Sequence, residues 1–393
     1  MEFPQIERRL SPPGHSFFLF GPRGTGKSTW LRRSFPRAHL LDLLNSSLFL
    51  ELARSPGNLE AMIGHAPAGT WVVLDEVQKL PGLLDEVHRL IETHRWNFSL
   101  CGSSARKLRR GGTNLLGGRA ITQTMEGFSL AELGKYAELD SVLQYGTLPI
   151  VWSHLGSAPE VLDAYVHTYM KQEIQEEGLV RKISPFLRFL GVAGQLNGQV
   201  VNGHGIARDA GVPRATVDTY FSILFDTLLG HLLPAWRPEA KVREAVHPKF
   251  YWFDPGVARA AAGYTFDPPD RTWLGFALET ILFHELRVYN TTSAKHRGIS
   301  YYRTPAGIEV DFVIETTKRQ ATKKPHVVLI ESKLSPAWDR RWEKPMLDLA
   351  AQSSLTVDRM FGVYNGNRTY HFGPVTVVPV VRFVEMLFEG NVF

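Results

Sequence analysis

The sequence predicts an α/β protein, because short apolar strands alternate with helical stretches in two separate parts of the chain. Near the start, the apolar run 17–20 is followed by a glycine-rich turn and a helical pattern that ends at Pro36. The run WVVLDE at 71–76 is almost entirely apolar, as is typical of a strand buried on both faces of a parallel sheet. Further strand-like runs follow after residue 264. We therefore expect an N-terminal three-layer α/β sandwich and a second, separate α/β unit.

Length and composition narrow the class of protein. At about 150 residues per domain, 393 residues suggest two or three domains, and 44% hydrophobic residues are enough to bury their cores. The net charge of +5 permits a nucleic-acid partner without requiring one. Cys101 is the single cysteine, which excludes internal disulfides and favours a reducing compartment, so we expect a cytoplasmic protein. The sequence has no secretion signal and no apolar run of membrane-spanning length, so we expect no membrane association.

Changes in the sequence pattern divide the chain into four expected units. They are a first α/β domain at 1–129, a small helical subdomain at 130–178, a helix-turn-helix domain at 179–263 and the second α/β domain at 264–393.

The helix-turn-helix is predicted from the string HGIARDAGVPRATVDTYFSIL, in which two helical patterns are separated by the turn AGVP. Asp209 and Asp218 oppose contact with DNA, so a unit used only for packing between domains is the alternative. The residues that such a motif would offer to phosphates and bases are Arg208, Arg214, Thr216 and Thr219.

A nucleotide site is predicted at GPRGTGKS, residues 21–28, which fits G-x-x-x-x-G-K-[ST] between a strand and a helix. Backbone N–H groups would converge on phosphate oxygens, Lys27 would reach the β- and γ-phosphates, and the Ser28 hydroxyl would ligate Mg²⁺. The expected cofactors are therefore ATP and Mg²⁺. The residues expected to bind them are Gly21, Pro22, Arg23, Gly24, Thr25, Gly26, Lys27, Ser28 and Thr29.

Two acids end the strand at 71–76 and complete the predicted hydrolytic site. Asp75 is placed to hold the magnesium ion through water, and Glu76 is placed to orient or deprotonate the attacking water. The alternative is that the two acids cap the next helix. Together with the glycine-rich loop, the acids predict an ATPase.

Two further residues look like parts of an oligomeric switch ATPase of the AAA+ superfamily. Ser103 ends the strand that follows, where such enzymes sense the γ-phosphate. Arg119 lies one helix later, where an arginine would reach the nucleotide of a neighbouring subunit, so a homo-oligomer is expected. Alternatively, Ser103 caps the next helix. The basic residues of that helix would then form a solvated or phosphate-binding face, and they are Arg106, Lys107, Arg109 and Arg110.

The second α/β unit contains a candidate metal site. By the period of two, Glu309 and Asp311 share one face of a strand while Val310 and Phe312 would share the other.

The next strand places Glu331 and Lys333 on one face, so two paired strands would bring them to Asp311 around one hard cation. This is the arrangement of a magnesium-dependent phosphodiesterase, in which carboxylates hold the metal and a lysine assists the chemistry. Glu279 on the preceding helix would add a metal ligand or cap a polar core. The alternative is a cluster of acids and lysine that is kept for stability alone.

Basic and aromatic residues near this site favour nucleic acid as a partner. A solvated hairpin tip is the alternative explanation of the lysines. The neighbours in the loop TKRQATKKPH and on the preceding strand are Lys318, Arg319, Lys323, Lys324, Tyr301, Tyr302 and Arg303.

The whole layout resembles prokaryotic AAA+ ATPases whose C-terminal part is a DUF4143 domain. The marks are GPRGTGKST, WVVLDEVQKLP, CGSS followed by GGR, MEGFSLAEL, YYRTPAGIEVDFVIE and LIESKLS. The resemblance implies an AAA+ P-loop domain that binds ATP, a central winged-helix unit and a C-terminal fold related to PD-(D/E)XK nucleases. It implies no settled substrate. Val310 stands where that motif has proline before the first aspartate, a harmless departure because proline ligates nothing.

Two hypotheses of function follow. The first is an ATP-driven protein that acts on DNA, binding it and cutting it at the C-terminal site if that site is active. The second is a regulatory switch ATPase whose winged-helix and inert nuclease-like domains bind protein partners.

Overall fold

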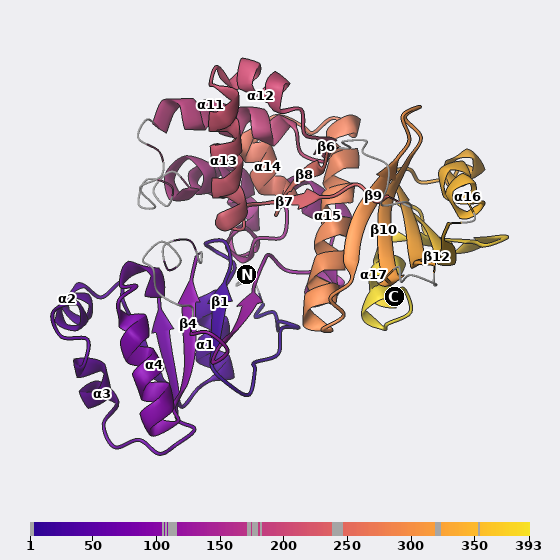
Figure 1. Ribbon diagram of the computed structural model, residues 1–393. Helices are drawn as coiled ribbons and strands as arrows, with labels where there is room; N and C mark the ends of the chain where they lie inside the picture. Colours follow the sequence, from indigo (N-terminus) through magenta and orange to yellow (C-terminus); the bar gives the residue numbers. More distant parts are fainter. Residues whose placement is uncertain are drawn as a thin grey trace.

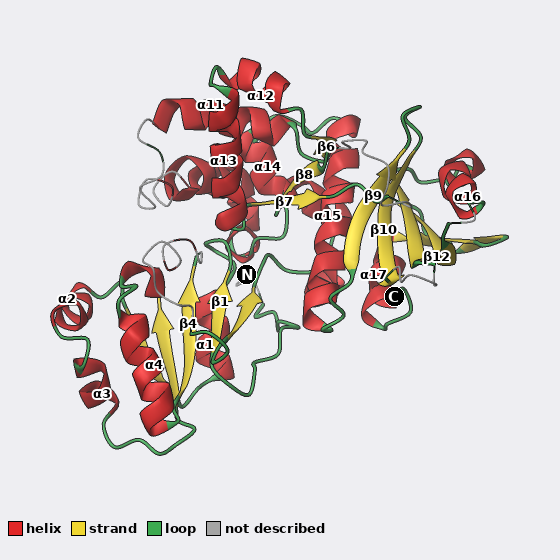
Figure 2. Cartoon of the chain, in the orientation of Figure 1, coloured by secondary structure: helices red, strands yellow, loops and turns green. Residues whose placement is uncertain are grey.

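The computed structural model shows a sheet-containing body at each end of the chain and a largely helical body between them (Figures 1 and 2). It describes residues 4–103, 106, 108, 116–170, 174, 180, 183–237, 247–318, 324–352 and 354–393. None of the helices in these ranges is long and apolar enough to cross a membrane.

The N-terminal unit is a five-stranded parallel sheet with the order β2-β3-β4-β1-β5. Its strands are β1 (Phe17–Phe20), β2 (His39–Asp42), β3 (Trp71–Asp75), β4 (Asn97–Gly102) and β5 (Ile121–Thr124). Its helices are α1 (Lys27–Ser34), α2 (Ser46–Arg54), α3 (Asn58–Ile63) and α4 (Leu83–His94), with the short turn η1 (Val77–Lys79).

Helices cover both faces of this sheet, because alternate residues of β1 belong to two different cores. Phe18 and Phe20 pack in the core that contains Val87 of α4. Phe17 packs instead in the second core, which contains Leu31 of α1. The three-layer α/β sandwich expected from the sequence is confirmed, and its parallel strands bring their carboxyl ends to one edge.

The middle unit is built mainly from helices. The first group is α6 (Leu130–Leu133), η2 (Gly134–Tyr136), α7 (Leu139–Tyr145), α8 (Pro149–Trp152), η3 (Leu155–Ser157), α9 (Ala158–Ala164) and the π-helical segment η4 (Tyr165–Met170). The second group is α11 (Ile183–Gln195), α12 (Gly203–Ala210), α13 (Arg214–Asp226) and α14 (Pro255–Ala261), with an antiparallel sheet of β6 (Gln199–Val200), β8 (Lys249–Trp252) and β7 (Gly230–Leu233).

The two groups of the middle unit share one hydrophobic core. Leu148 and Leu162 from the first group pack in the same cluster as Phe189, Val217 and Val257 from the second. The two groups therefore stabilise each other, because each buries the apolar face of the other.

The C-terminal unit is a six-stranded mixed sheet with the order β13-β14-β12-β11-β10-β9. Its strands are β9 (Gly298–Arg303), β10 (Glu309–Thr317), β11 (His326–Lys333), β12 (Thr356–Tyr364), β13 (Tyr370–Phe372) and β14 (Val375–Pro379). Its helices are α15 (Arg271–Thr292), η5 (Arg340–Glu343), α16 (Lys344–Ala350) and α17 (Val380–Phe388). The second, separate α/β unit expected from the sequence is thus confirmed.

The strict alternation expected along β10 is wrong at one point. Val310 packs in the core beneath α16, whereas Phe312 packs in the core that α15 and α17 cover. The pairing of β10 with β9 shifts register between Val310 and Val313, and such an irregularity moves the following side chains to the other face.

Candidate functional site

The glycine-rich loop between β1 and α1 encloses the side chain of Lys27. The ammonium group is buried and donates hydrogen bonds to the carbonyl oxygens of Gly21 and Pro22, at 2.7 and 2.9 Å. Gly26, at the N-terminus of α1, has φ of 84°, a left-handed conformation that favours glycine. A Cβ atom at Gly21 would collide with the carbonyl oxygen of Met125. The loop geometry therefore depends on both glycines and holds the lysine at the sheet edge.

Glu76 and Ser103 lie close together at this edge and are linked by the side chain of Gln78, for which the sequence predicts no role. The side-chain amide of Gln78 donates to Glu76 Oε2 at 2.6 Å and to Ser103 Oγ at 3.4 Å. Gln78 is buried, and Glu76 itself adopts the left-handed φ of 58°. The available sequence signal is a polar residue two positions after Glu76, the predicted catalytic residue. The arrangement connects the predicted γ-phosphate sensor to the predicted catalytic acid.

A small pocket beside α1 joins the predicted magnesium ligands. Ser28 and Asp75 both line it, together with Asp42. Asp42 ends β2 and is the register partner of Asp75 on β3, so the two carboxylates end neighbouring strands. Hydroxyl and carboxylate oxygens are the donors that Mg²⁺ prefers, so Ser28 and Asp75 fit the ion that a nucleotide would bring.

Arg119 lies near the amino-terminal ends of the strands, opposite the end of the sheet that carries the glycine-rich loop. It precedes β5, which runs parallel to β1, whereas the glycine-rich loop follows β1. Its side chain is 40% exposed, and its guanidinium forms an ion pair with Glu92 of α4. Arg119 is therefore separated from the nucleotide site of its own subunit.

The middle unit contacts the glycine-rich loop directly. The hydroxyl of Tyr165 donates to the carbonyl oxygen of Arg23 at 3.0 Å. From the N-terminal segment, Arg8 donates to the carbonyl oxygen of Thr25 at 2.9 Å. Arg106, after β4, forms an ion pair with Asp226 of α13. A change in the loop on nucleotide binding would therefore alter contacts with the middle unit.

The predicted helix-turn-helix residues lie on α12 and α13, and both arginines have acidic partners. Arg208 is 81% exposed and pairs with Asp209 at 3.0 Å, while Arg214 pairs with Asp218. Thr219 donates to the backbone of Ala215. Thr216 is half-buried.

In the C-terminal unit, the predicted carboxylates lie in one buried cluster but already have partners. Asp311 Oδ2 accepts hydrogen bonds from the backbone N–H and the hydroxyl of Ser332, both at 2.8 Å. Glu331 forms an ion pair with Lys333. Glu279 accepts from the hydroxyl of Tyr251 at 2.9 Å.

Lys249 of β8 also contacts Glu279, at 3.1 Å, and neither Lys249 nor Tyr251 was singled out from the sequence. Among the described residues, no group of three or more His, Cys, Asp or Glu side chains could hold a metal ion in this arrangement. The carboxylates as placed therefore do not fit a nuclease-type metal site.

The predicted basic and aromatic neighbours of this cluster are divided. Tyr301 is fully buried and its hydroxyl donates to the carbonyl oxygen of His247. The prediction that Tyr301 offers an aromatic surface to nucleic acid is therefore wrong. Arg303 pairs with Glu309. Lys318 and Lys324 are exposed. Five predicted basic residues lie outside the described residues: Arg319 and Lys323 of this loop, and Lys107, Arg109 and Arg110 of the helix expected after Ser103.

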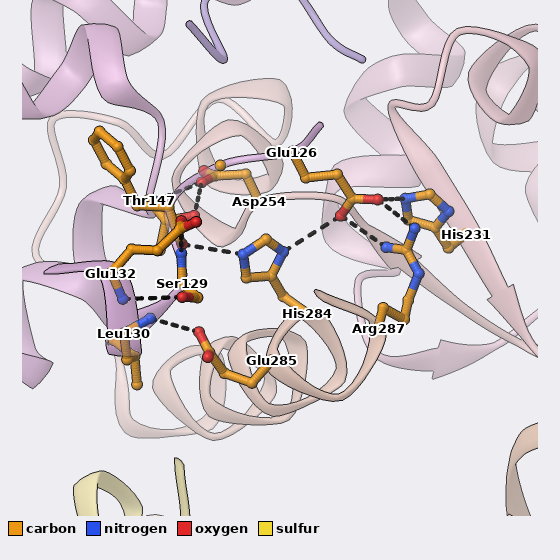
Figure 3. Close-up of polar contacts among 12 residues, drawn as sticks. Glu126, Ser129, Leu130, Glu132, Thr147, His231, Asp254, His284, Glu285 and Arg287 are labelled. Atoms are coloured by element: carbon orange, nitrogen blue, oxygen red, sulfur yellow. Dashed lines mark hydrogen bonds and ion pairs between the residues drawn. The ribbon is translucent and has the colours of Figure 1, made fainter. Parts of the chain in front are cut away.

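A second polar cluster, which the sequence did not reveal, lies where the three units meet (Figure 3). Glu126, between β5 and α6, accepts from Arg287 of α15 at 2.9 Å and contacts His284 at 3.3 Å. His231 of β7 lies 3.6 Å from the same carboxylate. Burial raises the pKa of Glu126, but Arg287 and the two histidines outweigh it and lower the pKa overall. Burial lowers the pKa of His231 to about 3.

Two other buried acids accept hydrogen bonds from backbone N–H groups at this junction. Asp254 accepts from the Thr147 N–H at 2.6 Å. Glu285 accepts from the Leu130 N–H at 2.7 Å, and burial raises its pKa to about 7. The junction thus ties α15 to the segment that follows the N-terminal sheet.

Glu285 makes the stability of the protein depend on pH. Because its pKa rises from 4.5 to about 7 on folding, its stabilising effect is complete below pH 4.5 and is lost as the pH rises through 7. We expect this loss to be about 3 kcal/mol, at about 1.4 kcal/mol per pKa unit. Denaturant unfolding at pH 5 and pH 8 measures it, with Glu285→Gln as the comparison. An equal fall in stability in the variant and the wild type would contradict the assignment.

Comparisons with known proteins agree with the N-terminal site. An AAA domain model matches residues 14–134, a domain of unknown function (DUF8612) matches 136–267, and another (DUF4143) matches 274–383. The N-terminal unit therefore matches an AAA domain, and this match supports a nucleotide-binding ATPase. The resemblance drawn from the sequence, an AAA+ ATPase with a C-terminal DUF4143 domain, is confirmed.

None of the curated proteins compared matches this chain. One solved structure that matches is a signal transduction ATPase with numerous domains and a tetratricopeptide repeat sensor, from Pyrococcus horikoshii. The identity is 12% and the TM-score 0.23, with 74% of this chain and 50% of that chain covered. The chain therefore spans half the length of that protein.

Proposed function

We propose that this ATPase hydrolyses ATP with Mg²⁺ and uses the cycle to act on DNA. The observation that supports it best is the single sheet edge that holds Lys27, the Ser28 and Asp75 pocket, and the Gln78 bridge between Glu76 and Ser103. A bound magnesium ion supplies charge neutralisation at the phosphates and would be held by Ser28 and, through water, by Asp75. Lys27 neutralises further phosphate charge.

Glu76 orients the attacking water and accepts its proton, and Ser103 contacts the γ-phosphate. Arg119 acts on the nucleotide of a neighbouring copy. It lies at the opposite ends of the strands from the glycine-rich loop, so it does not reach the nucleotide site of its own chain. This role requires a homo-oligomer.

We assign DNA binding to the middle unit. Two helices joined by a short turn, followed by a small antiparallel sheet, are the parts of a winged helix, and α13 would be its recognition helix. Lys318 and Lys324 on the C-terminal unit are exposed and would add positive charge for DNA phosphates. The C-terminal carboxylates do not fit a cutting site as placed, so we propose binding by this unit and derive no cleavage step.

One observation favours the second hypothesis, a switch ATPase with protein partners. Both arginines of the helix-turn-helix are paired with acids, which reduces the charge available to phosphates. The winged helix and the C-terminal unit would then present protein-binding surfaces to a partner.

Binding of fluorescent duplex and single-stranded DNA to the full chain, with and without a non-hydrolysable ATP analogue, distinguishes the two hypotheses. We expect Arg214→Ala to weaken binding and to lower the salt slope by about one, as for one lost phosphate contact. Arg89→Ala is the matched control, because Arg89 is also a half-exposed helix arginine paired with acids. Absence of DNA binding at low salt under all conditions would leave the protein-partner switch as the better assignment.

A further inference from the structure

Arg8, in the segment before β1, donates hydrogen bonds to three different parts of the chain. Its Nη1 donates to the carbonyl oxygen of Thr25 in the glycine-rich loop at 2.9 Å. Its Nη2 donates to the carbonyl oxygens of Glu126 and Gly127, at 2.7 and 3.0 Å, in the segment between β5 and α6. Its Nε donates to Oε1 of Glu132 on α6 at 3.2 Å, and the Arg8 side chain is only 10% exposed. The planar guanidinium holds these three parts in one fixed geometry, which a flexible lysine could not do.

On the loop side, Thr25 connects Arg8 to the buried lysine of the nucleotide site. Thr25 is fully buried, and its hydroxyl donates to the carbonyl oxygen of Pro22 at 2.9 Å. The same carbonyl oxygen accepts a hydrogen bond from Lys27 Nζ, also at 2.9 Å. Because the N–H groups of such a loop face the phosphates, a donor that fixes one of its carbonyl oxygens from the other side positions the loop. A displacement of Thr25 would therefore reach Lys27 through Pro22.

The segment between β5 and α6 is packed tightly between the loop and the middle unit. A Cβ atom at Gly21 would lie only 1.9 Å from the carbonyl oxygen of Met125. A Cβ atom at Gly127 would lie 2.3 Å from the hydroxyl oxygen of Thr147 in the middle unit. Neither position has room for a side chain. Because closely packed groups transmit a displacement instead of absorbing it, a shift of the loop would move this segment.

Glu126 joins the segment to the C-terminal unit (Figure 3). Its carbonyl oxygen accepts from Arg8, while its carboxylate accepts from Arg287 Nη1 of α15 at 2.9 Å. The carboxylate also lies 3.3 Å from His284 Nδ1 on the same helix. The main chain and the side chain of one buried residue thus connect the two arginines, so a change in the position of either one alters the geometry that the other requires.

We propose that Arg8 is a positioning residue of the nucleotide site and that it links the glycine-rich loop to the ion pair between Glu126 and Arg287. Nucleotide binding then stabilises the packing of α15. The packing of α15 raises the affinity for nucleotide by the same factor, because coupling between two sites is reciprocal. This inference rests on the proposed binding of ATP at the loop, and on neither hydrolysis nor DNA binding.

Titration of a fluorescent, non-hydrolysable ATP analogue with Mg²⁺ into the full chain tests the link. The proteins compared are the wild type, Arg8→Met, Arg287→Met and the double variant, at a temperature at which all are folded. We expect Arg8→Met to bind the analogue at least about tenfold more weakly, the effect of one lost hydrogen bond from a charged donor. Arg287→Met should weaken binding about fivefold in the wild type and less than about twofold in the Arg8→Met background.

Arg9→Met is the matched control. Arg9 is the neighbouring arginine, and its exposed guanidinium lies over the Phe388 ring of α17 instead of at the loop. This variant loses the same charge and should bind the analogue as the wild type does. If Arg8 only stabilised the fold, Arg287→Met would have the same effect on affinity with and without it.

Equal effects of Arg287→Met in both backgrounds, or equal affinities of Arg8→Met and Arg9→Met, would overturn the proposal. Should Arg8→Met fail to fold, amide hydrogen exchange in the wild type decides the question. We expect the analogue to slow exchange in the end of α15 that carries Arg287 as well as in the glycine-rich loop, and slowing confined to the loop contradicts the link. A wild type that does not bind the analogue would overturn the nucleotide site itself, and the link with it.

Discussion

Glu76→Gln is expected to slow ATP hydrolysis by at least about 100-fold, the usual contribution of a general base, while ATP binding persists. The amide keeps the shape of the side chain and can still accept the hydrogen bond from Gln78. It cannot take the proton of the attacking water. Steady-state hydrolysis and binding of a fluorescent ATP analogue measure the two effects separately.

Two variants accompany this measurement. Lys27→Ala should weaken nucleotide binding itself, because the ammonium group inside the loop is removed. Glu51→Gln is the matched control, since Glu51 is an exposed glutamate on α2 that contacts Asn58. A turnover number for Glu76→Gln equal to that of the control would exclude Glu76 as the catalytic acid and require another base.

Arg287→Met should destabilise the protein by about 3 kcal/mol, the usual result of removing one partner of a buried ion pair. Glu126 is 6% exposed, and in the variant its carboxylate would keep the contacts with His284 and His231 but lose the guanidinium of Arg287. Because Glu126 lies where the three units meet, the loss should weaken the packing of α15 against the N-terminal and middle units. Equilibrium unfolding in urea measures the change.

A double variant separates the charge effect from lost packing. Glu126→Gln removes the negative charge, so Arg287→Met in that background should be destabilising by clearly less than in the wild type. Arg382→Met is the control, because Arg382 lies on α17 in an exposed ion pair with Glu385. Equal effects of Arg287→Met in both backgrounds would show that Glu126 and Arg287 do not depend on each other.

Much of the N-terminal unit could be predicted because its signals are local. Strand β3 is visible as an unbroken apolar run, and the spacing of Gly21, Lys27 and Ser28 is a property of neighbouring residues. Parallel pairing then brings the ends of β1, β3 and β4 to one edge. Gln78 was visible in the sequence only as a mark of the family, because its function depends on a contact with Ser103 from the next strand.

The sequence by itself therefore determined the AAA-type α/β class, the separate C-terminal sheet and the candidate nucleotide residues. The tertiary structure alone decided which charges meet. Lys249 reaches Glu279 from another unit, 30 residues away in sequence, and Glu126 meets Arg287 across 161 residues. A register shift in β10 separated Val310 from Phe312. Such contacts depend on how the units pack, and hydrophobic periodicity carries information only about the face of one element.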